Sequence, residues 1–221
     1  MNKKITLEDI KKSDIINTYI KCADNSLEAM EYTEHGHKHV SIVSKVAGDL
    51  LRDLGHDSHT VELARIAGYM HDIGNCVNRV DHAQSGAIMA FRILNEMGMD
   101  ARDIATIITA IGNHDESTAF PVNEVAAALI LADKTDVRRS RVRCRLDQFD
   151  IHDRVNFAVI ENKTEVDIEA KTFTQTIQID TQIGAIMDYF EIYMNRLLLA
   201  KKAANRLGLH FKLTVNGTTF C

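Results

Sequence analysis

Apolar residues recur with helical periodicity through most of the first 137 residues. In the segment 63–74 they fall at Leu63, Ile66, Ala67 and Met70, on one face of a helix that requires a core to pack against. Similar stripes predict one or more short helices before residue 33 and longer helices over 37–54, 81–97, 101–111 and 122–137. The first part of the chain is therefore expected to be a helical bundle.

Individual residues predict where some of these helices begin and end. Gly74 is expected to end its helix in a left-handed turn, because glycine adopts that conformation at little cost. Asp81 with Gln84 resembles a capping box, and Asp100 is expected to cap the next helix. Pro121 is expected at or near the start of the helix 122–137.

From residue 139 the pattern changes to alternation of apolar and polar residues, which is typical of extended chain. It predicts an extended segment over 139–146 and three strands over 155–161, 165–170 and 174–180, with a turn at Asn162-Lys163 between the first two strands. A long helix over 181–205 and a last strand over 209–215 are expected to follow. We expect a mainly α, overall α+β protein with a small C-terminal antiparallel sheet and long helix. The predicted parts are a helical core, 1–137, and an extension packed on it, 138–221.

Composition limits the partners of the protein. A formal charge of −5 gives no general case for nucleic acid or an anionic membrane, and nucleic acid is disfavoured as a partner. The longest apolar run, 125–132, is too short to cross a bilayer. The start of the chain lacks the apolar segment of a signal peptide, and the four cysteines show no CxxC pairing. We therefore expect reduced thiols and a cytoplasmic protein.

Polar side chains interrupt the apolar faces of five predicted helices. A single buried histidine is usually just a hydrogen-bonded core residue. Five helices that each direct a metal-binding side chain inward are better explained by a shared metal site. The candidate ligands are His39, His71, Asp72, His82, His114 and Asp133. Imidazole and carboxylate ligands suit Fe, Mn, Co, Ni or Zn, so the expected cofactor is one or two divalent transition-metal ions.

The strings that contain these residues, in their order along the chain, resemble the HD-domain superfamily of metal-dependent phosphohydrolases. The similarity covers roughly residues 35–137 and includes HGHKHV, AGYMHDIGN, DHAQSGA, IGNHD and LILADKTD. The resemblance implies a first metal site made by four of the candidates, with Asp72 able to bridge to a second ion completed by His82 and His114. The first site would consist of His39, His71, Asp72 and Asp133.

Two departures from the resemblance concern the substrate. Many two-metal members have lysine where this chain has Asn75, and cyclic-dinucleotide enzymes usually have a second histidine where it has Asp115. The candidates for substrate contacts are Lys134, Asn75 and Arg138. The arginine-rich run 138–145 is a second candidate for a phosphate contact. As a whole it is interpreted as a solvated basic edge or as ion pairs with acidic residues elsewhere, with one arginine allowed near the site.

The expected function is hydrolysis of a nucleotide or related small phosphate ester, a phosphomonoester or phosphodiester, by metal-activated water, with Asp72 as the catalytic residue. A di-iron oxygenase that uses the same ligands and a non-hydrolytic metal- or nucleotide-binding regulatory module stay open as alternatives. For the C-terminal sheet, contact in a homodimer and a lid over the site both stay open.

Overall fold

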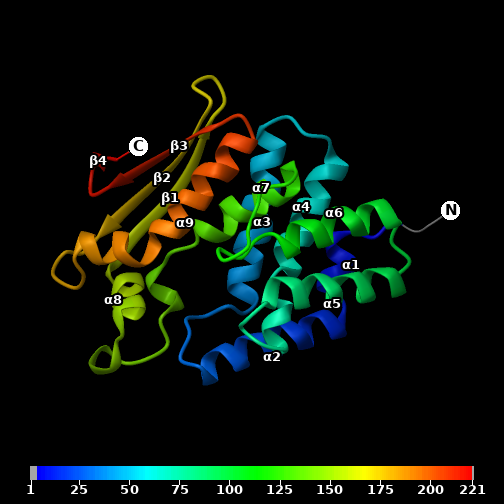
Figure 1. Cartoon of the computed structure of the whole chain (residues 1–221), viewed down its shortest axis with the longest axis horizontal. Coiled ribbons are helices and arrows are strands. Elements are labelled where there is room, and N and C mark those ends of the chain that lie inside the picture. The colour runs from blue at the N-terminus through cyan, green and yellow to red at the C-terminus, as the bar shows by residue number, and fades with distance from the viewer. Residues whose placement is uncertain (1–3, 221) are drawn as a thin grey trace.

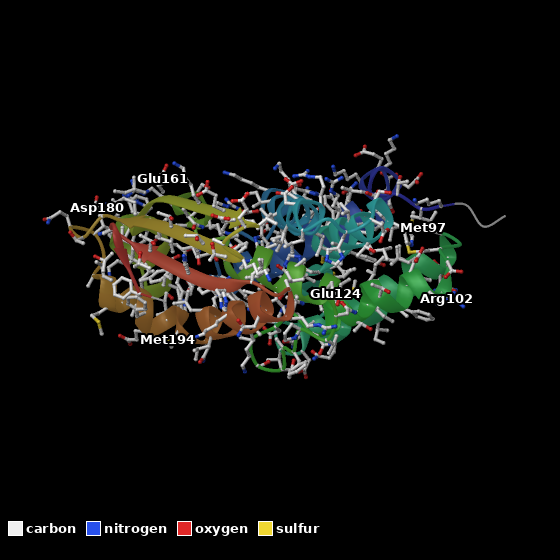
Figure 2. All side chains as sticks on the ribbon, turned by 90° about the horizontal axis from the view of Figure 1, so that it is seen from above. Met97, Arg102, Glu124, Glu161, Asp180 and Met194 are labelled. Carbon is white, nitrogen blue, oxygen red and sulfur yellow. The ribbon has the colours of Figure 1, made fainter. Side chains whose placement is uncertain are left out.

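The computed structural model describes residues 4–220 of the chain. Helices come first, and a small sheet with a long helix follows, so the predicted α+β fold class is confirmed (Figure 1). Figure 2 places Met97 and Arg102 toward one end of the molecule and Glu161 and Asp180 toward the opposite end. The helical part and the sheet thus lie side by side along the longest axis.

The helical part is organised around one fully buried helix. Its elements are α1 (Leu7–Lys11), α2 (Asp14–Ala29), α3 (His37–Asp53), α4 (Ser58–Met70), the 3-10 turn η1 (Ile73–Cys76), α5 (His82–Glu96), α6 (Ala101–Gly112) and α7 (Glu124–Lys134). Every residue of α7 after Glu124 is buried, as expected for a helix that is apolar on all sides. The helices α3, α4, α6 and α9 (Ile186–Arg206) all contact α7.

Several helix ends differ from the sequence expectation. α2 is one continuous helix where shorter ones were predicted. α7 begins later than predicted and is capped by the side chain of Asn123, so Pro121 lies outside it. Asp81 precedes α5 with a φ of 57° and makes no side-chain cap, while the Gln84 amide donates to Thr118 Oγ1 at 3.1 Å. Asp100 caps α6 as predicted.

Gly74 has a different role from the predicted helix stop. It lies inside η1 and is not among the glycines with positive φ. A methyl group on Gly74 would lie 2.0 Å from the backbone oxygen of His82 and 2.4 Å from the backbone nitrogen of Gly86. Glycine is therefore required here because η1 and α5 pack backbone to backbone, which holds His82 close to Asp72.

The C-terminal part is a four-stranded sheet with one long helix. Its elements are the 3-10 turns η2 (Arg139–Arg141) and η3 (Leu146–Gln148), α8 (Ile151–Ala158), β1 (Val159–Asp167), β2 (Thr172–Ile179), α9, β3 (His210–Val215) and β4 (Thr218–Thr219). The strand order is β1-β2-β3-β4. Because α9 carries the chain back between β2 and β3, these two strands are parallel, and the sheet is mixed where an antiparallel one was predicted.

Three further expectations for this part are wrong. A strand was predicted over 155–161, but residues up to Ala158 belong to α8 and β1 begins at Val159. The segment 139–146 folds into turns instead of extended chain, and the turn between β1 and β2 lies at 168–171, so Asn162 and Lys163 are inside β1. α9 contacts both β3 and α7, and thereby joins the sheet to the helical part (Figure 1). The domain boundary at residue 137 stays a prediction.

Two negative findings concern the described part of the chain. No helix within residues 4–220 has the length and apolarity needed to span a membrane. Cys22, Cys76 and Cys144 are free thiols, and Cys221 lies outside the described residues.

Candidate metal centre

The six candidate ligands predicted from the sequence come from five segments of the chain, since His71 and Asp72 are adjacent, and they meet inside the helical part. His39 lies in α3, His71 directly follows α4, and Asp72 directly precedes η1. His82 is the first residue of α5, His114 follows α6, and Asp133 lies near the end of α7. All six are buried.

Three of the four histidines are oriented by the same local hydrogen bond. In each, Nδ1 contacts the backbone oxygen of the residue three positions earlier: 2.9 Å for His71 and Gly68, 3.0 Å for His82 and Arg79, and 2.6 Å for His114 and Ile111. A carbonyl oxygen can only accept, so we assign the ring proton to Nδ1. Each Nε2 therefore carries a lone pair, and the rings present these lone pairs to one another.

His39 is oriented by a carboxylate instead. Its Nδ1 lies 2.7 Å from Asp136 Oδ2, and Arg138 Nε donates to Asp136 Oδ1 at 3.0 Å. Burial alone would raise the pKa of Asp136, but the hydrogen bond from His39 and the charges of Arg141 and Arg138 hold it well below its usual range. The result is the carboxylate–histidine arrangement that supports metal ligands in many proteins. Asp136 was not predicted as part of the site, because its contact with His39 joins residues 97 positions apart along the chain.

The first group of ligand atoms has the spacing of a metal coordination shell. His39 Nε2 lies 3.3 Å from His71 Nε2, 3.4 Å from Asp133 Oδ1 and 3.5 Å from Asp72 Oδ2. His71 Nε2 lies 3.3 Å from Asp72 Oδ2 and 3.8 Å from Asp133 Oδ1. Ligand atoms about 2.1 Å from one ion are separated by roughly 3.0–3.4 Å in octahedral or tetrahedral geometry. The four side chains therefore surround a space of the size that one ion requires.

A second group shares Asp72 with the first. The other oxygen of Asp72, Oδ1, lies 3.6 Å from Nε2 of both His82 and His114, and these two nitrogens are 3.2 Å apart. Burial and the neighbouring His114 lower the pKa of His82 to about 4, which favours the neutral ring that metals bind. Asp72 thus directs one oxygen into each group, which is the geometry of a carboxylate that bridges two ions.

The chemistry of this donor set fits a cation. Burial alone would raise the pKa of Asp72, but the neighbouring imidazoles of His71 and His114 hold it well below its usual range. Asp72 Oδ2 is nevertheless a buried atom without a hydrogen-bond partner among the described residues. Lone pairs of nitrogen and oxygen that face one another at these distances repel unless a proton or a metal ion lies between them. The residues present therefore fit one or two divalent metal ions.

The three predicted substrate contacts are engaged with protein groups. Lys134 Nζ lies 2.6 Å from Asp133 Oδ2 and 3.0 Å from Glu116 Oε1. The Asn75 amide donates to the backbone oxygen of Asp72 at 3.0 Å and to its Oδ1 at 3.1 Å. Arg138, as described above, holds Asp136. All three orient metal ligands in this structure, directly or through Asp136, and their contact with substrate stays a prediction.

A pocket of about 510 Å³ lies beside the ligands and contains residues that the sequence did not indicate. Its lining includes Tyr32, His35, Arg79, Arg141, Tyr193 and Arg196. Arg196 comes from α9, where it lies over the ring of Tyr193 and donates to the backbone oxygen of Asp133 at 3.0 Å. The C-terminal part of the chain therefore forms one wall of the pocket and contacts a metal-ligand residue.

Glu116 connects the pocket to this wall. Its Oε1 lies 3.3 Å from Arg196 Nε in addition to its contact with Lys134. Burial alone would raise the pKa of Glu116, but the charges of Lys134 and Arg196 lower it to about 2. The two cations and the carboxylates of Glu116 and Asp133 thus form one partly buried network that fixes Asp133 in place.

Comparisons with known proteins agree with this description. The model of the HD domain family matches residues 36–143, a span that contains all six candidate ligands. The uncharacterized protein MJ1020 of Methanocaldococcus jannaschii is 26% identical over 182 residues, which cover 72% of this chain and 70% of that protein. Ribonuclease Y of Oceanobacillus iheyensis is 35% identical over 100 residues, which cover 44% of this chain but only 18% of that protein.

One solved structure is also similar in part. The crystal structure of a predicted HD superfamily hydrolase from an uncultured Thermotogales bacterium aligns with a TM-score of 0.45 and 23% sequence identity, covering 61% of this chain and 75% of that one. The family match coincides with the segment in which the structure gathers the six ligands. Residues 36–143 of this chain therefore form an HD domain.

Proposed function

We propose that this protein is a metal-dependent phosphohydrolase that acts on a nucleotide or a related small phosphate ester. The observation that carries the proposal is the pair of ligand groups joined by Asp72. The pocket beside them has three arginines, Arg79, Arg141 and Arg196, among lining residues that also include carboxylates. When bound, divalent ions at such a site lower the pKa of coordinated water toward ~7 and polarise phosphoryl oxygens.

The side chains of the site have three roles: to hold the ions, to orient the ligands and to balance charge. His39, His71, Asp72 and Asp133 would hold one ion, and Asp72, His82 and His114 the other. The orienting hydrogen bonds place the ring proton of each histidine on Nδ1, which leaves the lone pair of Nε2 available to hold an ion. Lys134 and Arg196 balance the negative charges of Asp133 and Glu116. The positive charge of a bound ion would therefore be less reduced by these carboxylates and more available to the phosphate.

The dimensions of the pocket favour a small substrate. Its volume of about 510 Å³ is within the usual range for small-ligand sites, roughly 300–1,000 Å³. Residues of α8 and α9 close one side of it, including Asn156, Tyr193 and Arg196. A formal charge of −5 also disfavours a long polyanion, although the Ribonuclease Y similarity makes RNA a substrate that the assay has to include.

The test is phosphate release by the purified full chain after chelator treatment and addition of Mn, Co, Fe, Ni or Zn. Substrates would be nucleotides, generic phosphate esters and single-stranded RNA. Asp72→Ala should abolish release because it removes a ligand from both groups, whereas His59→Ala, at an exposed histidine paired with Asp103, should not change it. Equal activity of Asp72→Ala and wild type would refute the proposal. Turnover with Mn or Co would also argue against an iron-dependent oxygenase.

A further inference from the structure

Arg79 occupies a particular place beside the second group of ligands. It lies in the connection between η1 and α5, on the lining of the pocket. Its backbone oxygen accepts the Nδ1 proton of His82 at 3.0 Å, so the position of this residue is coupled to a metal ligand. The side chain then turns toward the same imidazole, where Arg79 Nη1 lies 3.3 Å from His82 Nε2.

The Arg79 guanidinium is the least firmly held of the three that line the pocket. Arg141 lies 3.7 Å from a carboxylate oxygen of Asp136, and Arg196 lies 3.3 Å from one of Glu116. Arg79 has no carboxylate within 4.0 Å among residues 4–220. Its polar contacts are His82 Nε2 and, at 3.4 Å, Asn75 Oδ1, and the guanidinium carbon lies 5.5 Å from the centre of the Tyr32 ring.

The contact with His82 is incompatible with metal binding. Since Nδ1 of His82 carries the proton, Nε2 has a single lone pair, which can be shared with an N–H group of Arg79 or with a metal ion, but not with both. A cation at this nitrogen would also repel the guanidinium. The donors of Arg79 would then turn to the pocket, held on one side by Asn75 and Tyr32.

We propose that Arg79 binds the phosphate group of the substrate and that metal binding at His82 makes it available to do so. The guanidinium fork matches two phosphate oxygens, and its place beside the second ligand group sets it next to the phosphorus that would be attacked. This inference rests on the proposed function, because it assumes that the group bound in the pocket is a phosphate ester.

The test measures binding of inorganic phosphate to the manganese-loaded full chain by calorimetry. Arg79→Ala should weaken phosphate binding roughly 10- to 100-fold, and Arg79→Lys should fall between, because it keeps the charge but loses the fork. Arg92→Ala is the matched control on α5, since Arg92 is exposed and pairs with Glu96. That variant should bind phosphate as the wild type does.

A second readout separates this role from a structural one. Arg79→Ala should bind the second manganese ion at least as tightly as the wild type, because a competing cation has been removed from His82. Loss of that ion in Arg79→Ala, or unchanged phosphate affinity, would overturn the proposal. If Arg79-dependent phosphate binding is found but no ester is cleaved, the inference stands and the proposed function fails. If Asp72-dependent cleavage is found and Arg79→Ala has the same KM as the wild type, the proposed function stands and the inference about Arg79 fails.

Discussion

At the scale of single residues, the same local hydrogen bond orients three of the four ligand histidines. His71, His82 and His114 each turn Nδ1 back to the carbonyl oxygen three residues earlier, at an end of a helix or just beyond it. Backbone carbonyls at helix C-termini lack partners within the helix, so the local structure supplies acceptors for His71 and His114. His39 lies within α3 and takes the Asp136 carboxylate instead. This makes His39 the one ligand histidine whose orientation depends on a distant side chain.

Asp136→Asn should therefore weaken binding of the first metal ion while the fold is kept. The amide has the same size but not the charge that stabilises the proton on Nδ1 of His39, and loss of such a supporting carboxylate typically costs roughly 10- to 100-fold in metal affinity. Metal titration by calorimetry would measure the change. Asp103→Asn, which removes the carboxylate from the half-buried His59–Asp103 pair outside both ligand groups, is the control. Wild-type metal affinity in Asp136→Asn would show that Asp136 does not support the ligand.

At the scale of elements, the periodic apolar residues predicted the helical bundle and the ligands that point into it. A helix with one face against a core has apolar residues that recur every three or four positions in its sequence. Contacts between residues of different elements produce no such periodic pattern in the sequence. Asn162 was predicted in a turn from its local preference, yet it lies in β1, where its amide donates to the backbone oxygens of Thr135 and Val137. This contact joins the sheet to the end of α7, and tertiary bonding prevails over local propensity. Asp136 and Arg196 escaped prediction for the same reason.

Gly74 gives a prediction at this scale. Gly74→Ala should destabilise the protein by about 2 kcal/mol or more, because its methyl group would meet backbone atoms of α5 that cannot move independently. The same displacement should weaken the second metal position, since α5 carries His82. Urea unfolding and metal titration would measure both effects.

Gly112→Ala is a matched control for that change. A methyl group on Gly112 would lie 3.6 Å from the Ala87 side chain, an ordinary contact, so stability should be unchanged or slightly higher. If Gly74→Ala is as stable as Gly112→Ala, the close packing of η1 on α5 is not required for the fold.

At the scale of the whole molecule, the two parts of the chain meet at the site. The HD domain supplies the ligands, and α9 brings Tyr193 and Arg196 to the pocket and to Asp133. The sequence predicted a sheet and a long helix but not this contact, since no pattern within α9 distinguishes Arg196 from a solvated arginine. The position of α9 against α7 places a segment outside the family match next to Asp133 and the pocket (Figure 1).

Metal binding should consequently stabilise the entire fold. The ligands are separated by up to 94 positions along the chain, from His39 to Asp133, so only the folded chain can present them to one ion. With free metal at about 100 times its dissociation constant, the stabilisation is roughly 2.7 kcal/mol. For a chain of this size that corresponds to a rise of about 5–10 °C in Tm. Thermal unfolding of chelator-treated protein, with and without added Mn or Co, would measure the rise.

Two variants decide whether the stabilisation comes from this site. Asp72→Ala should lose most of the rise in Tm, because it takes one oxygen from each ligand group. Without metal, Asp72→Ala should be about as stable as the wild type. The wild-type protein then has a buried carboxylate with no partner for Oδ2, which costs free energy in the absence of a cation. His59→Ala should keep the full rise, because His59 lies at the surface and belongs to neither group. A rise of equal size in Asp72→Ala would mean that the ions bind elsewhere, and the convergence of these six side chains would then need another explanation.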